Sequence, residues 1–139
     1  MTTELKTEFL QTIFQFKNLI NGSLGSPKDW QITLTEFLVL QKISDGKNLA
    51  TIREDLRITK AAISQTLSAL EKKNFLTRET NPQNRRQLIV KLTVLGNDVL
   101  AQTSKTFNQG FDIFVGEMNE QNLQQMLDQM QRMIEVLGN

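Results

Sequence analysis

The sequence TKAAISQTLSALEKK, from Thr59 to Lys73, predicts the central helix of this 139-residue chain. Thr59 is a preferred N-cap residue type, and Ile63, Leu67 and Leu70 recur at helical spacing, which indicates one apolar stripe. The opposite side, which we call the recognition face, carries short or hydrogen-bonding residues and a single charge: Lys60, Ala61, Ser64, Gln65 and Ser68. Such a face suits the acceptors and negative charge of a DNA major groove, although Ser and Gln on an exposed helix are more often simply solvated.

The segments on either side predict a helix-turn-helix followed by a β-hairpin. Leu49 to Ile58 is long enough for a short helix and a tight turn. After the central helix come a strand from Phe75 to Thr80, turn residues from Asn81 to Asn84, and an alternating run. That run places three apolar residues on one side: Leu88, Val90 and Leu92. This order is typical of a winged helix-turn-helix, in which the second helix enters the major groove and the basic hairpin tip reaches the neighbouring backbone or minor groove.

With these elements in place, the chain resembles the MarR family of transcriptional regulators over about half of its length. The matching residues are Leu34-Thr35, Ile58-Thr59-Lys60 with Ile63-Ser64, the run from Leu70 to Leu76, the wing from Asn81 to Arg86, and Leu92-Thr93 with Gly96. The resemblance implies a mainly α fold with a small β-hairpin wing, flanked by N- and C-terminal dimerisation helices. We therefore expect residues 1–32 to join a dimerisation region, residues 33–93 to form the DNA-binding lobe, and residues 94–139 to complete the dimerisation helices.

Three positions depart from the family's pattern. Asn84 stands where an Asp usually braces the wing, so a charged brace for Arg86 becomes at best a neutral hydrogen bond. Arg53 replaces a small residue in the first helix of the motif, and Arg57 replaces the Gly that is common in the turn. At the end of the central helix, Asn74 is expected to adopt the left-handed backbone that usually falls to Gly.

Specific roles follow for the polar residues of the central helix. Gln65 has the geometry to bond adenine bidentately, and Ala61 can touch a thymine methyl. Ser64 and Thr59 are expected to reach a base edge or a phosphate, with Ser68 on the same face.

The charge distribution supports contact with phosphate. Between Lys47 and Thr93, ten basic and four acidic residues give +6, whereas the rest of the chain has a net charge of −5. Lys and Arg residues in such a basic central segment favour DNA binding, because their contacts with phosphate release counterions from the DNA. The alternative is that these residues are simply solvated around the hairpin. Five cations are candidates: Lys60, Lys72 and Arg78 for phosphate, and, by family resemblance, Arg85 for phosphate and Arg86 for the minor groove.

The two ends of the chain predict helices that meet other helices. The first, from Thr3 to Asn21, has an apolar stripe that covers either its own core or another subunit: Leu5, Phe9, Ile13 and Phe16. The last, from Asn119 to Leu137, has a narrow seam that suits an interface, although intramolecular packing could also use it: Leu123, Leu127, Met130, Ile134 and Leu137. Together these residues predict a homodimer.

Two further helices are expected. One begins at a cap, either Thr33 in a capping box with Glu36 or Thr35 alone, and buries Phe37, Leu40 and Ile43. The other runs from the cap Thr93 to about Gly116, with Gly96 allowing a close backbone approach.

Family resemblance implies a repressor that loses DNA affinity when a small apolar or aromatic effector binds between the dimerisation helices and the DNA-binding lobe. Four aromatic residues are candidates for such a pocket: Phe14, Phe16, Trp30 and Phe111. For Trp30, the single Trp of the sequence, anchoring the core is the favoured role and lining a ligand cavity is the alternative.

The amino-acid composition excludes several other classes of protein function. Without Cys there is no disulfide or thiol sensor, and without His there is neither an imidazole-ligated metal nor the usual general base. We expect no enzyme, no metal and no cofactor. With no long apolar stretch and no signal core, we expect no membrane partner and a cytoplasmic location. A winged-helix module that binds protein instead of DNA is the alternative, and the wing pair Arg85-Arg86 argues against it.

Overall fold

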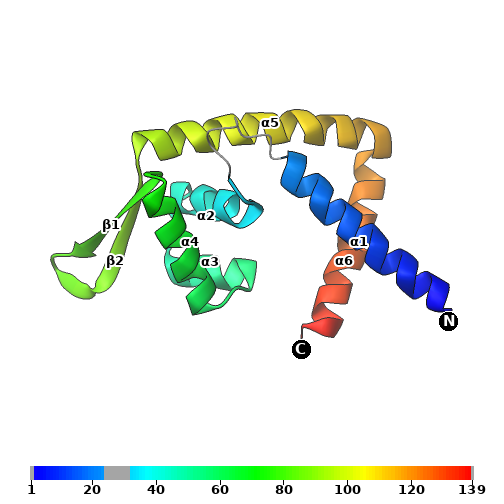
Figure 1. The fold of residues 1–139 in the computed structure, drawn as a ribbon, viewed down its shortest axis with the longest axis horizontal. Coiled ribbons are helices and arrows are strands. Elements are labelled where there is room, and N and C mark those ends of the chain that lie inside the picture. Colours follow the sequence, from blue (N-terminus) through cyan, green and yellow to red (C-terminus); the bar gives the residue numbers. More distant parts are fainter. Residues whose placement is uncertain (1, 24–31, 139) are drawn as a thin grey trace. The chain divides into compact units, whose positions relative to one another are not determined.

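The computed structural model describes residues 2–23 and 32–138. It is mainly helical with one two-stranded hairpin, as predicted (Figure 1). In chain order the elements are α1 (Thr3–Ser23), α2 (Leu34–Ser44), α3 (Leu49–Leu56), α4 (Lys60–Lys72), β1 (Leu76–Asn81), β2 (Asn84–Leu92), α5 (Val94–Met118) and α6 (Glu120–Leu137). The chain divides into two compact units, Met1–Thr106 and Phe107–Asn139.

Side-chain caps start the three helices of the helix-turn-helix region. Of the two predicted starts for α2, the capping box is correct, because the Glu36 amide donates to Thr33 Oγ1 (3.1 Å) and the Thr33 amide to Glu36 Oε1 (3.0 Å). Asn48 Oδ1 accepts from the Thr51 amide to begin α3. Thr59 caps α4 as expected, since its Oγ1 accepts from the Ala62 amide at 3.0 Å.

Left-handed residues end α3 and α4. Asn74 has a φ of 65°, which confirms the backbone expected of it. Arg57, in the place of the usual Gly, also has a positive φ, of 52°. A side chain with a Cβ is strained in this region, so the turn between α3 and α4 carries a cost that Gly would avoid.

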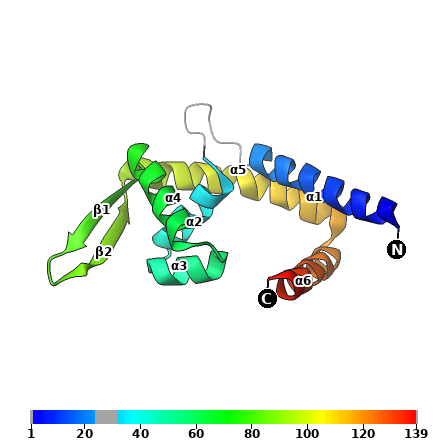
Figure 2. The same ribbon diagram turned by 60° about the horizontal axis from the view of Figure 1, so that its bottom comes forward.

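The core of the first unit forms where α2, α3, α4 and the hairpin meet (Figures 1 and 2). The stripe of α4 is buried as predicted, and Ile52 of α3 is fully buried beside it, while Leu56 and Ile58 are partly buried. In α2, Phe37 and Leu40 are buried and Ile43 only partly, whereas the fully buried Val39 was not predicted. Burial of this apolar surface stabilises the packing of α4 against α2, α3 and the hairpin.

The hairpin is antiparallel, with Leu76 opposite Leu92 and Arg78 opposite Val90. Val90 and Leu92 pack against the core, but Leu88, near the tip, is 42% exposed, so the predicted apolar face is covered only at its base. The register shifts between Thr80 and Asn81, and Asn81 pairs with Asn84 across the turn. The tip therefore extends beyond the core.

A close backbone approach joins the base of the hairpin to α5. The Thr93 amide donates to Phe75 O at 3.0 Å, and the Thr93 hydroxyl both donates to Asn74 O and accepts from the Gly96 amide. A Cβ at Gly96 would lie 1.9 Å from Phe75 O. Both the cap at Thr93 and the need for Gly96 were predicted.

The helices at the two ends leave much of their apolar surface uncovered in the single chain. α1 extends two residues beyond its predicted end and exposes Leu5, Phe9 and Ile13. In the second unit, α6 buries Leu123 but exposes Leu127 and Ile134. Within the described ranges, no helix is long and apolar enough to cross a membrane.

Candidate nucleic-acid interface

The recognition face of α4 is exposed along its whole length, while the opposite stripe is buried. In residues 2–23 and 32–138, Lys60 and Lys72 form no ion pair, so both charges are available to a ligand. Thr59 is also exposed, but its oxygen already accepts the capping hydrogen bond. Its hydroxyl proton is left to donate to a phosphate or base edge.

The wing tip presents Arg85 and Arg86 to solvent, and neither takes part in a salt bridge in the described part of the chain. Asn84 Oδ1 accepts from the Arg86 backbone amide at 3.2 Å. The neutral hydrogen bond expected to brace Arg86 thus reaches its backbone amide and not its guanidinium, which makes no ion pair in the described residues. Asn81 adds hydrogen bonds to the Gln83 amide and to Gln87, which stabilise the turn.

Arg78 has a carboxylate partner that was not predicted from the sequence. Its Nε and Nη2 donate to the two carboxylate oxygens of Glu71 at 3.2 and 3.0 Å, and Nη2 also lies 3.3 Å from Ser68 Oγ. The hydrogen bond from Arg78 lowers the pKa of Glu71, and the same bond raises the pKa of Arg78. Ser68 and Glu71 lie three residues apart on one helix face, and this spacing was the sequence signal that the two could share one partner.

A second unpredicted pair fixes the end of α4. Lys73 Nζ lies 3.0 and 2.9 Å from the two oxygens of Glu36, whose side chain is only 6% exposed. Glu36 is the capping-box residue of α2, so one carboxylate both starts the supporting helix and holds the recognition helix. A Lys in the polar run from Glu71 to Asn74 gave no sequence signal for this pairing.

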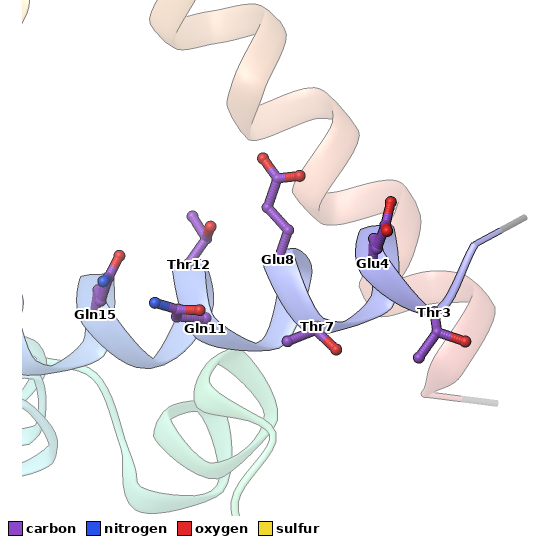
Figure 3. A pocket seen from close by; sticks show the side chains of 7 residues that line it. All are labelled: Thr3, Glu4, Thr7, Glu8, Gln11, Thr12 and Gln15. Atoms are coloured by element: carbon purple, nitrogen blue, oxygen red, sulfur yellow. The ribbon is translucent and has the colours of Figure 1, made fainter.

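The predicted effector pocket stays a prediction. Trp30 lies outside the described residues, and Phe111, which stacks on Phe107 at a centroid distance of 5.8 Å, belongs to the second unit. Phe14 is exposed and Phe16 partly buried. A surface hollow does occur on α1, but Figure 3 shows that the residues lining it all come from this one helix and carry polar groups: Thr3, Glu4, Thr7, Glu8, Gln11, Thr12 and Gln15.

The described residues contain no cluster of acidic side chains suited to a metal ion. What the first unit offers is an exposed polar helix face, with two arginines on a projecting hairpin and a third arginine between them. These features define a winged helix-turn-helix protein of the DNA-binding class.

Comparison with known proteins agrees with this class. The model of the MarR family matches residues 32–88. Over 125 residues the chain is 30% identical to the HTH-type transcriptional regulator SarZ of Staphylococcus epidermidis, covering 88% of this chain and 78% of SarZ. The chain belongs to the MarR family and is a DNA-binding transcriptional regulator, not an enzyme.

Solved structures share the fold. A mutant MarR from E. coli in complex with operator DNA has a TM-score of 0.73, with 20% identity and 92% of each chain covered. PcaV from Streptomyces coelicolor, in complex with its natural ligand, has a TM-score of 0.74, with 17% identity and coverage of 91% of this chain and 89% of PcaV.

Proposed function

We propose that the protein is a repressor that binds a pseudo-palindromic operator as a homodimer. The observation that carries this proposal is the uncovered recognition face of α4, flanked by the free Arg85 and Arg86 of the wing. Its central residue, Gln65, can bond adenine, while the wing arginines suit phosphate and a narrow minor groove. Its place of action would be the cytoplasm, with the DNA.

Dimerisation supplies the geometry that one lobe lacks. Two recognition helices about 34 Å apart, one turn of B-form DNA, would enter successive major grooves on one side of the duplex. The apolar residues left exposed on α1 and α6 support this assembly, because large uncovered apolar surface usually marks an interface. Leu127 and Ile134 of α6 and Phe9 of α1 are the residues we assign to it.

Selection of bound sequences from a random duplex pool tests the operator. We expect enrichment of an inverted repeat whose half-sites lie about one helical turn apart. Enrichment of one asymmetric half-site would contradict the dimeric geometry, and no enrichment at all would favour the alternative module that binds protein.

Sedimentation velocity tests the dimer directly. Leu127→Glu puts a charge on the exposed apolar side of α6 and should convert the protein to a monomer with weaker operator binding. Gln121→Glu adds the same charge at an exposed polar position of α6 and should leave the dimer intact. If both variants sediment like the wild type, α6 does not form the interface.

We further propose that a small apolar or aromatic effector releases the operator. The support is the family relationship together with PcaV, a structural relative solved with its natural ligand. A ligand acts in this way only if it binds a dimer with the wrong helix spacing more tightly than the DNA-binding one. Screening small aromatic compounds for loss of operator binding checks the idea, with Trp30→Leu expected to reduce the response.

A further inference from the structure

Arg78 links the wing to the recognition helix. Its guanidinium is held by Glu71 on one edge, and Nη2 also reaches Ser68, a member of the recognition face. Ser68 and Glu71 lie three residues apart on α4, so both point to the same side of the helix. Nη1, which carries two further N–H groups, makes no hydrogen bond in the part of the chain that the structure describes.

This ion pair is partly exposed, with 27% of the Arg78 side chain and 42% of the Glu71 side chain accessible. A pair this exposed adds little to folding stability. What the paired hydrogen bonds do provide is order, because a flexible arginine is held in one geometry before any ligand arrives. The free edge of Arg78 is thus fixed beside the recognition face.

We propose that Glu71 is a positioning residue for DNA binding, which holds Arg78 so that its free Nη1 edge meets a DNA phosphate next to the recognition face. The inference rests on the proposed operator binding and deepens it. Arg78 itself contacts the phosphate, whereas Glu71 acts on DNA binding only through its hold on Arg78. Pre-ordering matters here because an arginine fixed in advance loses less side-chain entropy when it binds.

The proposal predicts a result opposite in sign to simple electrostatics. Glu71 is a negative charge close to a surface that binds phosphate, so its removal should strengthen DNA binding if charge alone counts. If Glu71 positions Arg78, its removal should weaken DNA binding although the protein becomes more positive.

The test measures duplex affinity over a range of salt concentrations for Glu71→Gln, Arg78→Gln and the double variant. We expect Glu71→Gln to weaken binding by roughly three- to tenfold, the loss expected when a charge-assisted hydrogen bond is no longer pre-ordered. Its salt slope should fall by about 0.9, the change expected when one phosphate fewer is neutralised. In the Arg78→Gln background, Glu71→Gln should leave affinity unchanged or raise it, because no arginine remains to position.

Glu79→Gln is the matched control. Glu79 is an exposed acid next to Arg78 on β1, and it forms no ion pair in residues 32–138. Removal of the Glu79 charge should leave the affinity for DNA unchanged or raise it, because only the net charge of the surface changes. Thermal unfolding of each variant separates a folding defect from a binding defect, since a folding defect lowers the melting temperature without DNA and would not by itself change the salt slope.

Tighter binding by Glu71→Gln, or an equal reduction in affinity with and without Arg78, overturns the positioning role. Gln65→Ala, measured on the same DNA, distinguishes failure of the positioning role from failure of the proposed operator binding. If Gln65→Ala loses sequence preference while Glu71→Gln binds more tightly, only the positioning role fails. If the wild type prefers no sequence, operator binding fails, and the phosphate contact of Arg78 is judged on random duplex.

Discussion

Lys73 Nζ lies within 3.0 Å of both carboxylate oxygens of Glu36, which joins the last turn of the recognition helix to the first turn of the helix behind it. Glu36 is buried and also accepts from the Thr33 amide, so both of its carboxylate oxygens accept hydrogen bonds. The orientation of α4 against α2 therefore depends on a polar link as well as on the apolar core.

Removing Lys73 should destabilise the fold. Lys73→Met leaves a buried carboxylate without its ammonium partner and should reduce the free energy of unfolding by about 1–3 kcal/mol. Lys72→Met is the control, because the neighbouring Lys72 is exposed and unpaired in the described part of the chain. Urea unfolding of both variants checks the prediction, and equal stabilities would show that the link contributes nothing.

Gly96→Ala should be strongly destabilising. The new Cβ would lie 1.9 Å from the backbone oxygen of Phe75, so the hairpin base or α5 must move. We expect a decrease of roughly 2–4 kcal/mol in the free energy of unfolding. Gly110→Ala, also in α5 but with open space around it, should instead gain up to about 1 kcal/mol from helix propensity. A neutral Gly96→Ala in denaturant unfolding would contradict the close approach.

Arg57→Gly should stabilise the protein. The residue has a φ of 52°, where a Cβ is strained, so Gly should add about 0.5–1 kcal/mol after its greater freedom in the unfolded chain is counted. Arg57→Ala removes the same side chain but keeps the Cβ, and it should give no gain. Calorimetric midpoints distinguish the two, and a gain shared by Ala would point to the arginine side chain rather than to strain.

Gln65→Ala and Lys72→Ala should affect DNA binding in different ways. Removal of a bidentate base contact should cost about 1–3 kcal/mol of sequence preference, with random DNA bound nearly as before. Lys72→Ala should weaken all sequences alike and flatten the salt slope by roughly one unit. Fluorescence anisotropy with operator and random duplexes measures both quantities, and parallel decreases would remove the base-reading role of Gln65.

The Glu71–Arg78 pair should make stability depend on pH in the acid range. Because the hydrogen bond from Arg78 lowers the folded-state pKa of Glu71 below its ordinary 4.5, the pair contributes stability above pH 4.5 and loses it as pH falls through the lowered value. The melting-temperature advantage of the wild type over Glu71→Gln should therefore shrink on acidification. In an Arg78→Gln background the same comparison should be independent of pH, and persistence of the dependence there would assign it to another group.

The order of elements and the exposed side of α4 were predictable because they depend on local patterns. Thr33, Thr59 and Thr93 act within one helical turn, and the apolar stripe of α4 repeats with the helix period. The left-handed Asn74 follows from the same local chemistry. The wing was predictable from its turn residues and alternating run, and the dimer was expected from the apolar stripes of the end helices. Family resemblance added the separate roles of Arg85 and Arg86 and the expected effector.

Contacts between elements were harder to predict. Arg78 was expected to face phosphate freely, yet Glu71 pairs with it, and Lys73 pairs with a carboxylate 37 positions earlier in the chain. Val39 lies outside the simple stripe of α2 and is nonetheless fully buried, since neighbouring elements cover a second side of that helix.

Local patterning along the chain was thus enough to specify a helix with one apolar side and one side suited to DNA, because capping and periodicity act over a few residues. The partners of its charged residues depended on how β1 and α2 pack against that helix, because a salt bridge forms only when folding brings two distant side chains within about 4 Å. That packing separates the cations left free for DNA, such as Lys60 and Arg86, from Lys73, which holds the helix in place.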